Sequence, residues 1–184
     1  MNARVNEAQT PLIILGADPG LANTGWGIVA RKGGQYRALA YGCIHTSAGL
    51  ETSVRLKQIY DELLVVIDRF QPTELGIESI FFGANTRSAF ATGQAKGAIL
   101  IACATRGLTV EEYTPMQIKQ SIVGTGSATK EQVQYMVQSV LHLDHVPTPD
   151  HAADALAAAV CHGNMRGLRT LEAGLAEYEK GHVQ

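Results

Sequence analysis

An uninterrupted apolar run near the N-terminus constrains the fold more than any other feature of the sequence. The run is Leu12-Ile13-Ile14-Leu15-Gly16-Ala17, and Asp18-Pro19-Gly20 follows it directly. A short apolar run without polar alternation is typical of a β-strand buried on both faces, and the proline and glycine predict a turn where the run ends. Asp18 is therefore expected at the carboxyl end of a buried strand, where α/β proteins usually bind their ligands.

The segments that follow this run predict an α/β domain. Two further strands are expected, joined by a hairpin turn at Lys32-Gly33-Gly34, and helices and strands then alternate. A crossover helix precedes the strand that ends at Glu78, so that strand is expected to lie parallel beside the first one. The expected fold is a five-stranded mixed sheet flanked by helices. We expect strands at 24–31, 35–46, 75–78 and 108–113, and helices at 51–70, 86–104, 115–122, from the capping box at Thr129, and from about 150 to 165.

Length and composition are those of one globular domain. Of the 184 residues, 46% are hydrophobic and 17% are charged, which excludes a disordered chain. We expect a flexible N-terminus at 1–11, a single domain at 12–166 and a polar tail at 167–184. No apolar run reaches the roughly 18 residues of a membrane span, no signal sequence is visible, and the three cysteines are too scattered for a disulfide framework. These features predict a cytoplasmic protein with free, buried thiols and no membrane partner.

The net charge of −2 does not indicate a strongly basic nucleic-acid binder. Acidic residues are concentrated at 51–78 and 143–164, segments that contain Glu78, Asp150 and Asp154. A divalent metal among these carboxylates would neutralise part of that charge.

Asp18 and Glu78 each end a mostly apolar strand. Taken alone, Asp18 could cap a turn and Glu78 could be a solvated strand end. Two carboxylates at the ends of adjacent parallel strands would, however, lie roughly 5 Å apart, which is unfavourable unless a cation lies between them. Oxygen ligands of this kind suit Mg²⁺ or Mn²⁺.

A third group of candidate ligands lies in the sequence Asp150-His151-Ala152-Ala153-Asp154. On a helix, His151 and Asp154 project from the same face because they are three positions apart. Asp150 is expected to be the N-cap of that helix. Asp154 is surrounded by alanine and leucine, and a buried carboxylate needs a partner such as a metal ion.

Four segments of the sequence carry a family resemblance. They are LGADPGLANTGWG, IESIFF, PMQIKQSIVGTGSATKEQV and DHAADALA, and they occur in this order over about residues 12–165. Together they resemble the RuvC family of Holliday junction resolvases. The resemblance implies a ribonuclease H-like fold and Mg²⁺- or Mn²⁺-dependent endonuclease activity on four-way DNA junctions. It also implies a homodimer with one active site for each strand that is cut, and a partnership with the RuvA–RuvB branch-migration complex.

The resemblance also implies the roles of individual residues. Carried over by motif, Asp18, Glu78, His151 and Asp154 are the catalytic metal ligands, holding two ions in each active site. One ion would activate water and the other would stabilise the leaving 3′ oxygen, so the expected products are a 5′-phosphate and a 3′-hydroxyl. Family members carry either Asp or His at the position of His151. A neutral His151 is expected to bind metal or to relay a proton, and to favour Mn²⁺ over Mg²⁺.

The DNA-binding residues implied by the resemblance are Lys119, Lys130, Phe81 and Phe82, and Arg87 in the loop after Glu78 is a further candidate. The two lysines suit phosphate contacts, although a solvated surface lysine is the ordinary alternative. Phe81, with Phe82 beside it, is expected to wedge between bases at the junction, although most Phe pairs belong to a core. Arg87 is expected to contact a phosphate.

Two other classes of protein remain as alternatives. One is an actin-like ATPase or kinase lobe, which also places Asp-x-Gly at the end of its first strand, but this chain has no second strand of that kind. The other is a junction-binding subunit without catalytic activity. Cleavage of a four-way junction in Mn²⁺ without ATP would distinguish all three.

Overall fold

The computed structural model describes the backbone of residues 10–80 and 86–182, and the side chains of residues 10–80 and 89–168. Within these ranges the chain alternates strands and helices. The strands are β1 (Leu12–Asp18), β2 (Asn23–Lys32), β3 (Gln35–His45), β4 (Glu74–Glu78) and β5 (Thr109–Tyr113), and the helices are α1 (Thr52–Phe70), α2 (Thr86–Thr105), α3 (Pro115–Val123), α4 (Lys130–Val140) and α5 (Asp150–His182).

The strands form one mixed sheet in the order β3-β2-β1-β4-β5. The β1–β2 and β2–β3 pairs are antiparallel, whereas the β1–β4 and β4–β5 pairs are parallel. The predicted five-stranded mixed sheet is confirmed, and so is the parallel position of the strand that ends at Glu78 beside β1. Because β1 and β4 run in the same direction, their carboxyl ends meet at one edge of the sheet.

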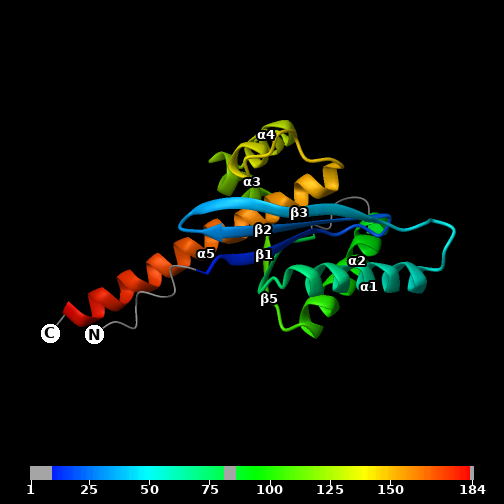
Figure 1. Cartoon of the computed structure of the whole chain (residues 1–184), viewed down its shortest axis with the longest axis horizontal. Coiled ribbons are helices and arrows are strands. Elements are labelled where there is room, and N and C mark those ends of the chain that lie inside the picture. The colour runs from blue at the N-terminus through cyan, green and yellow to red at the C-terminus, as the bar shows by residue number, and fades with distance from the viewer. Residues whose placement is uncertain (1–9, 81–85, 183–184) are drawn as a thin grey trace.

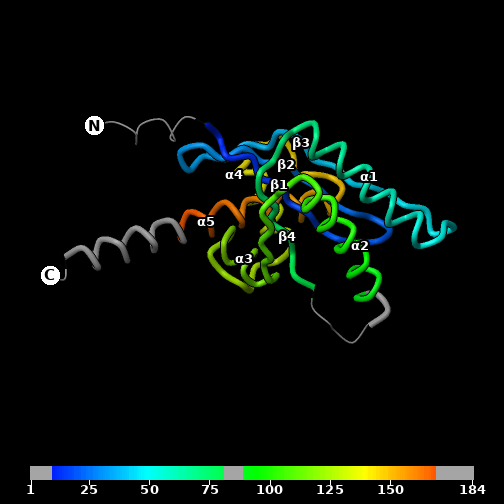
Figure 2. The backbone as a smooth tube through the Cα atoms, turned by 90° about the horizontal axis from the view of Figure 1, so that it is seen from below, coloured from blue at the N-terminus to red at the C-terminus, as the bar shows by residue number. Residues whose placement is uncertain are grey.

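Helices cover both faces of this sheet (Figure 1). On one face, Leu15 and Ile28 of the sheet pack against Ile59 and Leu63 of α1 and Ile99 of α2. Figure 2 shows α1 and α2 side by side, in agreement with their mutual contacts. The other face is covered by α3, α4 and α5, which share a second buried cluster with β1 and β2.

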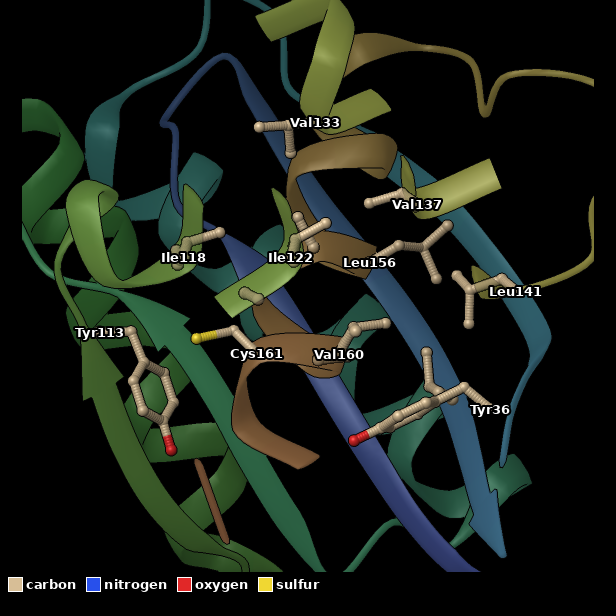
Figure 3. Packing of buried hydrophobic residues seen from close by; sticks show 14 of the residues in the cluster. Tyr36, Tyr113, Ile118, Ile122, Val133, Val137, Leu141, Leu156, Val160 and Cys161 are labelled. Carbon is tan, nitrogen blue, oxygen red and sulfur yellow. The ribbon is translucent and has the colours of Figure 1, made fainter. Parts of the chain in front are cut away.

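Side chains from three helices meet in this second cluster, as Figure 3 shows. Burying them removes apolar area from water, at roughly 25 cal/mol per Å². This packing holds α3 and α4, which carry Lys119 and Lys130, against α5. The helix residues labelled in the figure are Ile118 and Ile122 of α3, Val133 and Val137 of α4, and Leu156, Val160 and Cys161 of α5.

Two strand glycines allow α5 to lie directly on the sheet. A Cβ atom added to Gly16 would lie 1.9 Å from the Ala155 carbonyl oxygen, and one added to Gly25 would lie 1.9 Å from the His151 carbonyl oxygen. Any side chain at either position would therefore push α5 away. Because Gly25 pairs with Asp18 across β1 and β2, this close approach brings the start of α5 over the carboxyl end of β1.

Most predicted elements are found within two residues of their expected bounds, and the capping box at Thr129 is present. The end of the last helix was predicted wrongly, because α5 continues past Met165 to His182 through a proline-free segment. The prediction that Asp150 caps this helix is also wrong. Asp150 is its first helical residue, and its carboxylate lies 3.2 Å from both Lys130 Nζ and Gln134 Nε2 of α4. The helix begins there because the Pro149 carbonyl already accepts hydrogen bonds from the N–H groups of Ala152 and Ala153.

The three cysteines are free, with Cys103 and Cys161 buried and Cys43 only partly so. None of the described helices combines the length and apolar character needed to cross a membrane.

Candidate active site

Asp18 and Glu78 occupy matching positions on adjacent strands. Ala17 of β1 pairs with Ile77 of β4 in parallel register, and each candidate carboxylate is the next residue of its strand. The sheet thus brings together two side chains from distant parts of the sequence, as the strand pattern predicted.

The start of α5 adds the two remaining candidate ligands. His151 Nδ1 lies 2.7 Å from Asp18 Oδ2. Since an ionised carboxylate only accepts hydrogen bonds, the imidazole Nδ1–H is the donor. In a neutral ring Nε2 then carries the lone pair. Asp154, one turn further along α5, lines a cavity of about 280 Å³ together with Glu78, Lys119 and Lys130.

Asp18 and Asp154 lie close enough to Glu78 for their charges to raise its pKa. Burial, together with the negative charges of Asp18 and Asp154, raises the pKa of Glu78 to about 7. The pKa of Asp18 is raised mainly by burial and further by Asp154, while its hydrogen bond with His151 opposes the rise. The site therefore contains carboxylates that repel one another and are poorly hydrated.

Lys130, the first residue of α4, lies within this acidic cluster. Its Nζ is 3.1 Å from Asp154 Oδ2 and 3.2 Å from Asp150 Oδ2. Both Lys119 and Lys130 lower the pKa of Glu78 through their positive charge. The sequence suggested a phosphate contact for Lys130, but it did not indicate that this lysine also pairs with a candidate metal ligand.

The donor set fits a divalent cation in its chemistry. Carboxylate oxygens and an imidazole are suitable ligands for Mg²⁺ or Mn²⁺. The positive charge of a cation would oppose both the burial and the repulsion that raise the pKa of Glu78. Within the described ranges, no three His, Cys, Asp or Glu side chains are arranged to hold one ion together. Three of the four donors have other partners instead, since His151 and Asp18 contact each other and Asp154 contacts Lys130.

The structure tests only part of the predicted DNA-binding set. Lys119 and Lys130 line the cavity beside Glu78. Phe81 and Phe82 lie outside the described residues, as does the side chain of Arg87. The chain is described again from α2 onward.

Strand glycines are the functional feature that sequence reasoning missed. Gly25 was seen only as part of a motif, yet its missing side chain lets His151 approach the sheet. The detectable signal was a pair of glycines within apolar strands together with an alanine-rich helix that has to cover them.

Comparison with known proteins identifies the family. The family model "Crossover junction endodeoxyribonuclease RuvC" matches residues 14–162. The chain belongs to the RuvC family. A RuvC family protein from Moorella thermoacetica, named crossover junction endodeoxyribonuclease RuvC, is 48% identical over 165 residues, which are 90% of this chain and 99% of that protein. This membership decides against the actin-like ATPase alternative.

Solved structures of the RuvC family agree with this fold. T. thermophilus RuvC in complex with a Holliday junction substrate is 38% identical, with a TM-score of 0.83 over 86% of this chain and 97% of that one. The expected ribonuclease H-like fold is confirmed by this match. The yeast mitochondrial Holliday junction resolvase Ydc2 has the same fold at 11% identity and a TM-score of 0.59, over 86% of this chain and 82% of that one.

Proposed function

We propose that this RuvC family member is a Holliday junction resolvase, a metal-dependent endonuclease that cuts two strands of a four-way DNA junction symmetrically. The observation that carries the proposal is the convergence of Asp18, Glu78 and Asp154 beside His151 at one edge of the sheet. The T. thermophilus relative in complex with a Holliday junction supports junction DNA as the substrate.

Asp18, Glu78, Asp154 and His151 would hold two Mg²⁺ or Mn²⁺ ions. When bound, such ions activate water and stabilise the leaving oxygen in phosphodiester hydrolysis. Their positive charge would also stabilise the ionised form of Glu78, which burial disfavours. Asp18 and Glu78 are positioned by strands, whereas His151 and Asp154 are positioned by one helix turn.

The protein's own residues would orient the substrate and move the proton. With Nδ1–H donated to Asp18, Nε2 of His151 is the atom that can accept a proton from the attacking water or bind an ion. Lys119 and Lys130 would bind phosphate oxygens next to the scissile bond. Attack of the water oxygen on phosphorus breaks the bond to the 3′ oxygen, and that oxygen gains a proton, which leaves a 5′-phosphate and a 3′-hydroxyl.

Symmetric cutting requires a second active site, and α2 offers a surface for a homodimer. Phe90 and Ile101 are 69% and 62% exposed on one side of this helix, and a Cβ at Gly97 between them would meet nothing within 4 Å. Large exposed apolar side chains on one helix face favour association with another molecule. Ala95 and Ala98 of the same helix pack into the core.

The remaining functional assignments follow from the family. Phe81 and Phe82 would open base pairs at the junction centre, Arg87 would contact a phosphate, and the RuvA–RuvB branch-migration complex would be a partner. The free cysteines fit a reducing cytoplasm.

A labelled four-way junction incubated with Mn²⁺ and no ATP tests the proposed function. We expect paired nicks at symmetric positions, ligatable ends and no cutting of a linear duplex with the same sequence. Asp18→Asn is the matched control, because it removes one ligand while leaving the phosphate-binding lysines in place. This variant should bind the junction, but its cleavage rate should fall by more than about 100-fold. Loss of a hydrogen bond that only supports a metal ligand typically lowers activity by about 10- to 100-fold. Binding without cutting by the unmodified protein would instead indicate a catalytically inactive junction-binding subunit.

A further inference from the structure

A buried lysine lies on the opposite face of the sheet from α5. Lys96 belongs to α2, and only 7% of its surface is exposed. Its Nζ lies 2.7 Å from Glu112 Oε2 of β5 and donates a hydrogen bond to the Glu78 carbonyl oxygen at 3.4 Å. One ammonium group therefore connects a helix to the ends of two neighbouring strands, and one of these strands ends in a candidate metal ligand.

The sheet itself leaves the Glu78 carbonyl poorly supported. The Ser79 N–H donates to the Tyr113 carbonyl of β5 at 2.8 Å. In a trans peptide the Glu78 carbonyl then points the opposite way, toward β1. After Asp18, β1 continues with Pro19, which has no N–H to donate. Pro19 therefore cannot donate the next backbone hydrogen bond of the β1–β4 pair to the Glu78 carbonyl. Lys96 of α2 supplies a donor to that carbonyl instead.

Stability alone does not account for a charge at this position. Removing an ammonium group from water is costly, and an apolar side chain of similar volume is often as stabilising as a buried ion pair. Glu112, the partner of Lys96, has a side chain that is 48% exposed, so water weakens the attraction between them.

We propose that Lys96 is a positioning residue for Glu78: it fastens the end of β4 to α2 and so directs the Glu78 carboxylate toward Asp18 and Asp154. This inference rests on the proposed function only in assigning Glu78 as a metal ligand. Lys96 touches neither substrate nor metal in this assignment, and it acts through the Glu78 backbone.

Lys96→Met tests this role because it keeps the length of the side chain and removes the donor and the charge. Mn²⁺ affinity, measured by electron paramagnetic resonance without DNA, should fall about 10- to 100-fold, as it does when the support of a metal ligand is lost. Junction binding without metal should be unchanged, and kcat should fall. Glu112→Gln is the matched control, since it removes the ion pair but retains the hydrogen bond from Lys96 to Glu78, and its Mn²⁺ affinity should stay near that of the unmodified protein.

A purely structural role gives a different result. In that case Lys96→Met and Glu112→Gln would lower Tm alike and leave Mn²⁺ affinity unchanged, which would overturn the proposal. If Lys96→Met does not fold, the double variant Lys96→Met/Glu112→Gln leaves no unpaired charge, and it should show the same loss of affinity. An unmodified protein that binds Mn²⁺ but cuts no junction would contradict the proposed function. The Mn²⁺ affinities of Lys96→Met and Glu112→Gln would still test the role of Lys96.

Discussion

The imidazole Nδ1 of His151 lies 2.7 Å from Oδ2 of Asp18, although 133 positions separate the two residues in the sequence. This contact joins the end of β1 to the start of α5 and determines which imidazole nitrogen faces away from Asp18. A candidate metal ligand thereby orients the group best suited to accept a proton.

His151→Asp should narrow the preference for Mn²⁺ over Mg²⁺. The substitution replaces an imidazole, which favours the softer ion, with a carboxylate beside Asp18. His151→Ala should lower the cleavage rate by about 10²- to 10⁴-fold, the usual contribution of a general acid or base. Single-turnover rates in each metal measure both effects. The role assigned to His151 is wrong if His151→Ala cuts as the unmodified protein does, or if His151→Asp leaves the ratio of the two rates unchanged.

Glu78→Gln should make the metal-free protein more stable at pH 8. The folded-state pKa of Glu78 is about 7, above the ordinary value of 4.5. The stability that its proton contributes is fully present below about pH 4.5 and is lost as the pH rises through 7. A neutral glutamine avoids that loss, so Tm in EDTA should rise by a few degrees at pH 8, and the gain should disappear near pH 4.5.

Thermal denaturation from pH 4.5 to pH 8 measures this difference. Glu62→Gln, at an exposed position of α1, is the control and should change little at either pH. Added Mn²⁺ should raise the Tm of the unmodified protein more than that of Glu78→Gln, because a ligand stabilises the folded state that binds it. If Glu78→Gln has a lower Tm than the unmodified protein at pH 8 in EDTA, the buried carboxylate of Glu78 does not destabilise the metal-free fold, and the assignment is wrong.

Lys130→Ala should weaken junction binding and reduce its salt dependence. Loss of one phosphate contact lowers the slope of log K against log salt by about one unit. Without DNA, Mn²⁺ should bind the variant at least as tightly as the unmodified protein, because the ammonium no longer competes for Asp154. Lys57→Ala is the matched control, since Lys57 is an exposed lysine of α1 that pairs with Asp61. An unchanged slope would place Lys130 outside the DNA interface.

Ile101→Glu should convert a dimer into monomers if α2 forms the interface. Ile101 is 62% exposed, so the glutamate costs little in a monomer but would bury a charge between two copies. Sedimentation should show half the mass, and the cleavage products should change from paired cuts to single nicks. A dimer that survives this substitution would place the interface elsewhere.

Local patterns were enough to predict most of the elements and the acidic residues at the ends of two strands. The apolar run before Asp18 and the capping box at Thr129 depend on interactions within a few positions of the chain. The parallel placement of Glu78 beside Asp18 could also be predicted, because a crossover helix restricts the next strand to few positions. The wrong assignment of Asp150 as a cap shows the boundary of such reasoning, since its partner Lys130 comes from another helix.

The sequence by itself thus determined an α/β fold with carboxylates at the ends of two buried strands, because burial and capping are encoded by neighbouring residues. Only the tertiary structure decided how those carboxylates are partnered. The contacts of His151 with Asp18, of Lys130 with Asp154 and of Lys96 with the Glu78 carbonyl each join different elements. They require α5 to lie close to the sheet at Gly16 and Gly25 and α2 to pack on the other face of the sheet. Their geometry depends on how closely whole elements pack, which no local pattern specifies.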